Sequence, residues 1–244
     1  MSKLTDNYWR VRERIAQAAR RAGRTDSDVT LVAISKGHPL SMIAALMQVG
    51  QRDFGENRVP EGSEKVVASR TTFDPAAALR WHFVGNIQRR KAREVVEHFG
   101  LLHAVDRPEL GERLSKLAVE RATTVRILLE CNTSGEASKA GFATQHWAED
   151  AAQRTAFFTQ VTHLLTLPGL IIDGLMTMAP IVDDPEATRP VFRRLAGLRT
   201  ALAQQFPQAP WSHLSMGMTD DFEVAVEEGA TLVRVGRAIF ETTT

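Results

Sequence analysis

The sequence predicts an α/β fold: a single (β/α)8 TIM barrel that covers residues 1–244 as one domain. Two observations carry this prediction: short apolar runs alternate with segments of helical periodicity, and there are eight of each. Such alternation indicates parallel βαβ units, and eight units in 244 residues match the length of a closed barrel. An open, doubly wound sheet is the alternative, because the second run is short. No Pro/Gly/Ser-rich linker or low-complexity segment divides the chain.

Each predicted strand is a short apolar run of the kind that is buried on both faces of a parallel sheet. The runs are 29–35, 53–55, 79–85, 101–106, 125–132, 170–177, 211–216 and 231–236. Each predicted helix has apolar residues that recur every three or four positions. The helical segments are 4–22, 41–49, 58–69, 87–99, 107–121, 147–165, 185–205 and 220–228.

Composition excludes several classes of protein. The 30 Lys and Arg residues nearly balance the 29 Asp and Glu residues, which argues against a dedicated nucleic-acid-binding protein. Cys131 is the only cysteine, so an internal disulfide is impossible and a reducing cytoplasm is the expected compartment. Residues 1–24 are charged throughout, unlike a signal peptide, and no apolar run is long enough to span a membrane.

Lys36 ends the first predicted strand in the stretch "VTLVAISKGHPL". A charge at the end of a buried strand is costly, so such a lysine reaches water, pairs with a carboxylate or takes part in chemistry. In (β/α)8 barrels the reactive groups lie at the carboxyl ends of strands. Lys36 is therefore a candidate functional residue, and a solvent-facing lysine is the alternative.

The last two predicted strands end in an expected anion site. Ser215, Gly217 and Thr219 precede a predicted helix, and Gly236 and Arg237 precede the short segment "AIF". Helix N-termini expose backbone N–H groups that bind phosphate, and barrels often bind phosphate after their seventh and eighth strands. An ordinary helix cap at Thr219 is the alternative.

A lysine on the first strand and an anion site on the last two become neighbours when the barrel closes. Pyridoxal 5'-phosphate fits this arrangement: its aldehyde condenses with lysine, its phosphate needs N–H donors and its ring nitrogen needs one partner. Arg234, near the end of the eighth strand, could be that partner. The alternative for Arg234 is an ion pair in the barrel wall.

Five motifs together resemble one family: "LVAISKGHP", "DFGENRVPEG", "WHFVGNIQRRK", "GLMTMAP" and "LSMGMTDDFEVAVEEGATLVRVGRAIF". They look like the signatures of the pyridoxal phosphate homeostasis protein family, whose barrel is similar to the N-terminal domain of alanine racemase. The resemblance spans nearly the whole chain. It implies a protein that binds and buffers pyridoxal 5'-phosphate, with no settled catalytic turnover.

The resemblance also implies a role for individual residues. Lys36 would be the Schiff-base lysine, and Arg234 would face the pyridine nitrogen. Asn57 would border the cofactor ring. The phosphate would be held by Ser215 and, through their backbones, by Gly236 and Arg237.

The sequence departs from the family pattern in two loops. Arg58 replaces the tyrosine that is common after "GEN", and Pro60 replaces a glutamine. Asn86 stands where His or Pro is more frequent, and the basic run 89–93 follows it. We expect this run to be a solvated helix face, with a site for an anionic partner as the alternative.

Three functions remain open on sequence alone: a cofactor homeostasis protein, an amino-acid racemase on the same barrel, and an aldolase in which Lys36 attacks a carbonyl without cofactor. No pair of the seven histidines has zinc-site spacing, so no metal is expected, and Ser215 lacks the context of a serine nucleophile. No catalytic residue is predicted. We expect no counterpart of the second domain that the resemblance associates with racemases, and Tyr8 is the only tyrosine in the sequence, which favours a monomeric carrier that is not an enzyme. Apoenzymes that need pyridoxal 5'-phosphate are the possible recipients.

Overall fold

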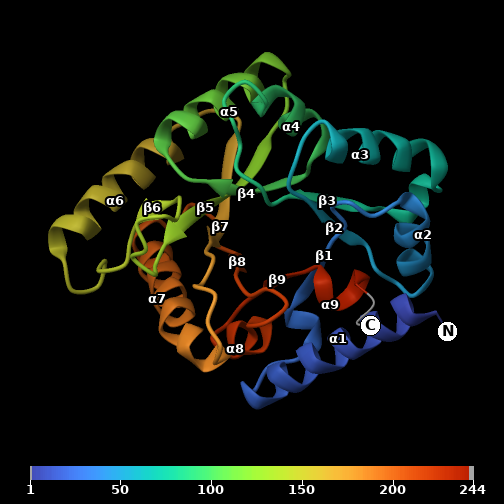
Figure 1. The fold of residues 1–244 in the computed structure, drawn as a ribbon. Helices are drawn as coiled ribbons and strands as arrows, with labels where there is room; N and C mark the ends of the chain where they lie inside the picture. The colour runs from blue at the N-terminus through green and yellow to red at the C-terminus, as the bar shows by residue number, and fades with distance from the viewer. Residues whose placement is uncertain (1, 242–244) are drawn as a thin grey trace.

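Eight parallel strands close into a barrel in the computed structural model, which describes residues 2–241 (Figure 1). The order around the barrel is β1, β2, β3, β4, β5, β7, β8 and β9, and β9 pairs with β1 to complete the circle. Helices surround the strands on the outside (Figure 1). This confirms the predicted (β/α)8 barrel, and the pairing of β9 with β1 excludes the open sheet.

The barrel strands match the eight predicted apolar runs. They are β1 (Thr30–Ile34), β2 (Asp53–Glu56), β3 (Arg80–Phe83), β4 (Leu101–Val105), β5 (Val125–Asn132), β7 (Leu170–Met176), β8 (His213–Ser215) and β9 (Leu232–Val235). A further short strand, β6 (Phe142–Ala143), pairs with β5 outside the circle. Periodicity could not predict this strand, because two residues are too few to show one.

The helices follow the strands in the predicted alternation. The α-helices are α1 (Lys3–Arg21), α2 (Leu40–Gln48), α3 (Glu61–Thr72), α4 (Ala92–His98), α5 (Pro108–Glu120), α6 (Ala151–Leu165), α7 (Arg189–Gln205), α8 (Phe222–Glu227) and α9 (Arg237–Phe240). Three short 3-10 turns, Asp26–Asp28, Pro75–Ala77 and Pro185–Thr188, complete the set. None of the helices in residues 2–241 has the length and apolar character needed to cross a membrane.

Several predicted helices begin later than their periodicity indicates, α4 and α6 by four or more residues. Residues 89–91 form a turn, and α4 starts only at Ala92. The consecutive cations at 89–91 are unfavourable at the positive end of a helix dipole, which explains the late start. The expectation that the whole basic run is one helix face is therefore wrong. The other helix, α6, starts at Ala151 because the Asp150 side chain accepts hydrogen bonds from the first backbone N–H groups.

Most of the core lies between the strands and the helices. Alternate residues of each strand point outward to the helices, and the others point into the barrel. Val32, Leu101, Leu128, Met176 and Leu232 form a smaller apolar cluster inside the barrel. Buried polar side chains share that interior, and they connect it to the rim where the predicted site lies.

The two ends of the chain pack together on the outside of the barrel. In α1, Tyr8, Val11, Ile15 and Ala18 are buried at helical spacing. The side-chain amide of Asn7 donates to the backbone carbonyl of Ile239 in α9 at 3.3 Å. In Figure 1, α1 and α9 lie side by side although they come from opposite ends of the sequence. This packing fixes α9 next to β1.

Candidate functional site

The predicted site residues come from four neighbouring strands of the barrel. β9 pairs with both β1 and β8, and β1 pairs with β2, so the loops after these strands meet at one rim. The register of β1 and β9, with Ala33 opposite Val235, puts the ends of the two strands level with each other. The residues gathered on or next to these four strands are Lys36, Asn57, Ser215, Arg234, Gly236 and Arg237.

Lys36 is exposed in the turn that follows β1. Its ammonium makes no hydrogen bond or ion pair with any residue in the described range 2–241. The next residue, Gly37, has a φ of 72°, a left-handed conformation that favours glycine. The backbone N–H of Gly37 donates to Glu61 at 3.0 Å. The protein thus fixes the backbone of this turn and leaves the lysine side chain available.

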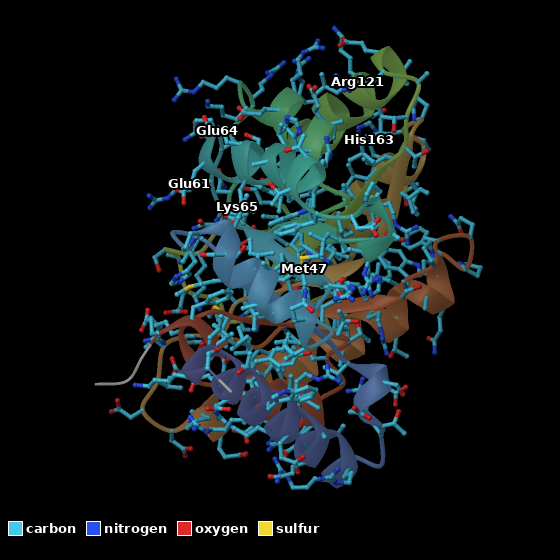
Figure 2. All side chains as sticks on the ribbon, turned by 90° about the vertical axis from the view of Figure 1, so that its right-hand side faces the viewer. Met47, Glu61, Glu64, Lys65, Arg121 and His163 are labelled. Atoms are coloured by element: carbon cyan, nitrogen blue, oxygen red, sulfur yellow. The ribbon has the colours of Figure 1, made fainter. Side chains whose placement is uncertain are left out.

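A buried ion pair lies next to the same turn. Lys65 in α3 donates to Glu56 Oε1 at 2.6 Å and to the backbone carbonyl of Ser35 at 2.7 Å. The Ser35 hydroxyl donates to the same Glu56 oxygen at 2.7 Å. Only 1% of the Glu56 side chain and 9% of the Lys65 side chain are exposed. Figure 2 labels Lys65 and Glu61, which lie on α3 and hold the backbone on either side of Lys36.

Arg234 is buried in the barrel wall, with polar partners on two of its nitrogens. One nitrogen donates to the Ser215 hydroxyl at 2.7 Å, and another donates to the backbone carbonyl of Thr177 at 3.0 Å. Burial lowers the pKa of Arg234 to about 10, while the charges of Asp221 and Glu130 act in the opposite direction. The guanidinium is still protonated at neutral pH, so it can donate a hydrogen bond to a ligand but cannot accept one.

The hydroxyl of Ser215 is fully buried at the end of β8. Besides Arg234 it contacts Nδ1 of His103 at 2.8 Å. His103 in turn contacts His82 at 3.0 Å, so both histidines are hydrogen-bonded inside the barrel. The role of Ser215 in holding a phosphate stays a prediction.

The loop after β8 and the start of α9 expose backbone N–H groups. Gly217 has a φ of 92°, and a Cβ there would lie 2.6 Å from the Cβ of Ala225, so only glycine fits. The Gly236 carbonyl accepts from Ile239 and Phe240 inside the last turn. The N–H of Arg237 opens this turn and has no intrahelical acceptor. Its side chain instead pairs with Asp220.

Asn57 follows β2 and is half-buried. Its backbone carbonyl passes so close to Gly85 that a Cβ on Gly85 would lie 2.1 Å from the oxygen. This contact packs the loop after β2 on the loop after β3. The following residue, Arg58, is exposed, and the bond between Val59 and Pro60 is cis.

Glu130 is a buried carboxyl group that acts electrostatically on Arg234 and that sequence reasoning missed. It lies on β5 and is 4% exposed. Burial raises its pKa to about 7, helped by the negative charge of Asp106 and opposed by Arg234. A carboxylate within the apolar run "ILLECN" was the available signal. In contrast, burial raises the pKa of the neighbouring Cys131 thiol, which makes this cysteine a poor nucleophile.

The model of the family "Alanine racemase, N-terminal domain" matches residues 7–243. A pyridoxal phosphate homeostasis protein of Vibrio cholerae is 39% identical over 240 residues, which cover 98% of this chain and 96% of the relative. The chain belongs to the pyridoxal phosphate homeostasis protein family. PipY of Synechococcus elongatus, a solved structure with pyridoxal phosphate bound, is 35% identical and has a TM-score of 0.75. The likeness covers 93% of this chain and 100% of PipY.

The solved structure of alanine racemase from Corynebacterium glutamicum is similar to this chain at a lower sequence identity. It is 16% identical, with a TM-score of 0.64, and the likeness covers 95% of this chain and 61% of the racemase. At this identity the likeness shows a shared barrel fold and nothing about activity.

Proposed function

We propose that this protein binds pyridoxal 5'-phosphate, holds it covalently on Lys36, and buffers or delivers it in the cytoplasm as part of intracellular homeostasis of the cofactor. The observation that carries the proposal is the place of Lys36: an exposed ammonium in the turn after β1, with no hydrogen-bond or ion-pair partner among residues 2–241, next to β9 with its buried arginine. The name of the relatives and the ligand of PipY support the same function.

The residues at this rim fit the three functional groups of the cofactor. When bound, the cofactor supplies an aldehyde that condenses with a primary amine. Lys36 provides this amine and must lose a proton before it can attack. Arg234 provides an N–H for the ring nitrogen, and Asn57 borders the ring. Gly236 and Arg237, by their backbones, and Ser215 hold the phosphate.

The same residues favour storage over catalysis. Arg234 donates to the ring nitrogen and cannot keep it protonated as a carboxylate would, so the ring withdraws electrons weakly. A racemase needs a base on each face of the substrate carbon. Tyr8, the only tyrosine, is buried in α1 against Trp9, at a centroid distance of 5.1 Å, and lies outside the barrel. We therefore propose a monomeric carrier without turnover, with apoenzymes as recipients, over the alternative of an amino-acid racemase.

Titration of the protein with pyridoxal 5'-phosphate tests the proposal. A visible absorbance band should appear and disappear on reduction with borohydride, and pyridoxal without phosphate should bind at least about tenfold more weakly, a difference of ~1.4 kcal/mol. Equal affinity for pyridoxal 5'-phosphate and pyridoxal would contradict a phosphate site.

Gly236→Val should weaken phosphate binding more than Ser215→Ala, because a larger side chain at residue 236 obstructs the backbone amides. The same titration with pyridoxal 5'-phosphate measures both variants.

Incubation of the loaded protein with L-alanine and other L-amino acids tests the alternative. We expect D-enantiomer formation, followed by chiral chromatography, to be far slower than enzymatic turnover of about one per second. Turnover at or above that rate that is lost in Lys36→Ala would favour the racemase.

A further inference from the structure

A chain of four hydrogen bonds crosses the inside of the barrel. Arg234 donates to the Ser215 hydroxyl at 2.7 Å, and this hydroxyl lies 2.8 Å from Nδ1 of His103. Nε2 of His103 lies 3.0 Å from Nδ1 of His82, and Nε2 of His82 lies 3.1 Å from Asp53 Oδ1. All five side chains are buried. The chain begins at the candidate cofactor site and ends at Asp53, the first residue of β2 and hence at the opposite end of the barrel.

The two ends of the chain determine where each proton lies. Arg234 can only donate. At the other end, burial tends to raise the pKa of Asp53, but hydrogen bonds from His82 and Arg80 outweigh it and lower the pKa, so Asp53 is ionised and only accepts. The Ser215 hydroxyl accepts from Arg234 and therefore donates to His103 Nδ1. His103 then carries its proton on Nε2 and donates to His82, which donates to Asp53.

A phosphate held by Ser215 needs the same hydrogen that His103 uses. A hydroxyl has one hydrogen to donate. When Ser215 donates to the phosphate, its oxygen and the bare Nδ1 of His103 face each other with no hydrogen between them. Two buried acceptors in contact are unfavourable, and a proton on Nδ1 relieves the conflict. Ser215 then accepts from both Arg234 and His103 and donates to the phosphate.

We propose that phosphate binding reverses the hydrogen bond between Ser215 and His103 in this chain and takes up one proton from water, which the His103 and His82 pair holds. The inference rests on the proposed function, because it takes the cofactor phosphate to be the anion at Ser215. No covalent bond between heavy atoms changes: one proton leaves water and joins an imidazole nitrogen. The added positive charge is balanced by the phosphate on one side and by Asp53 on the other.

The proton can enter from the opposite end of the barrel. His82 and Asp53 line a cavity of about 730 Å³ that is formed around the amino ends of the strands, with Arg80, Trp81 and His213 among its other lining residues. The cofactor would not need to leave for the histidine pair to exchange protons with water.

The charges around the His103 and His82 pair favour proton uptake only when an anion is bound. Burial, together with the charges of His82 and Arg234, holds the pKa of His103 well below its usual value, so the free protein keeps this ring neutral. A bound dianion favours the charged ring and raises that pKa, so binding draws a proton in. The charged and titratable groups that act on the pair, directly or through its neighbours, are Asp53, Arg80, Arg126, Glu130, Asp173, His213, Asp221 and Arg234.

Calorimetry with benzyl phosphate tests the inference, because this ligand keeps a phosphate on a ring-bound methylene group. It has no aldehyde to react with Lys36, and no ring nitrogen or phenol whose own ionisation would change the proton count. Binding is measured at pH 8 in two buffers of different ionisation enthalpy, where the phosphate is already a dianion because its second pKa is about 6. We expect uptake approaching one proton per ligand. Affinity should accordingly fall about tenfold per unit rise in pH while uptake is complete.

The variant His103→Asn places an amide that can donate to Ser215 without taking up a proton, so it should bind the ligand with no uptake. His213→Asn is the matched control, because His213 lines the same cavity but its hydrogen-bond partner is Thr231, at 3.5 Å. This control should keep the uptake. If His103→Asn does not fold by circular dichroism, Ser215→Ala replaces it, since removal of the hydroxyl must also abolish uptake.

Each result separates the inference from the function on which it rests. Binding by the wild type without proton uptake contradicts the reversal of the hydrogen bond between Ser215 and His103 and leaves the proposed function intact. Uptake that persists in His103→Asn or Ser215→Ala contradicts it as well. A wild type that binds neither benzyl phosphate nor pyridoxal 5'-phosphate overturns both proposals.

Discussion

Lys36→Ala is expected to abolish the visible absorbance band that pyridoxal 5'-phosphate produces with the wild type. The variant loses the only amine proposed for covalent attachment, so any remaining cofactor is held by the ring and phosphate contacts alone. Because Lys36 is exposed and its side chain makes no hydrogen bond or ion pair with other described residues, the free energy of unfolding should change by no more than about 0.5 kcal/mol. Absorbance titration and thermal melting measure the two effects separately.

Lys139→Ala is the control for this variant. Lys139 lies in another rim loop, where its ammonium donates to the Met178 carbonyl at 3.0 Å and pairs with Glu136 at 2.5 Å. An amine engaged in this way should not react, so the band should persist. A reducible band in Lys36→Ala, lost only when Lys139 is also replaced, would move the attachment site to Lys139.

Lys65→Met is expected to produce the largest loss of stability, about 3–5 kcal/mol, because it leaves the buried Glu56 carboxylate without its cation. Urea unfolding of the cofactor-free protein measures this loss. The variant should also bind cofactor more weakly, because Lys65 holds the Ser35 carbonyl immediately before Lys36.

Lys91→Met is the matched control for the buried pair. Lys91 lies 3.7 Å from Glu94, and both side chains are about one third exposed, 37% and 29%. An exposed pair contributes roughly 0–1 kcal/mol, so this variant should unfold close to the wild-type urea concentration. Equal losses in the two variants would show that the Glu56 and Lys65 pair does not stabilise the fold as argued.

The double variant Glu56→Gln, Lys65→Met should recover part of the stability that Lys65→Met loses, since no unpaired charge remains buried.

The strands and the closure of the barrel were predictable because they depend on local patterns. A strand such as β5 is a continuous apolar run, and the alternation of strands and helices leaves few alternative topologies. The starts of α4 and α6 were not predictable from periodicity, because the apolar spacing continues into the preceding turns. Charge at 89–91 and the cap at Asp150 decide these boundaries instead.

That the candidate residues lie on neighbouring strands was predictable, but the contacts that support them were not. The rule that barrel strands carry reactive groups at their carboxyl ends located Lys36 and Arg234 at one rim. The pairing of Lys65 with Glu56, and of His82 with His103, depends on register between separate elements, and no spacing along the chain encodes it. The roles implied for Asn57 and for the phosphate-binding residues remain predictions, and Gly236→Val and Ser215→Ala test the phosphate site.

Borohydride reduction of the loaded protein, followed by proteolysis and mass spectrometry, tests the central claim most directly. Reduction makes the bond between cofactor and lysine permanent, so the modified residue can be identified by its peptide. The account predicts one added cofactor per chain, located on Lys36, and no label when phosphate-free pyridoxal is used at the same low concentration. A label on Lys65, Lys139 or another lysine, or no stable mass increase despite a visible band, would contradict it.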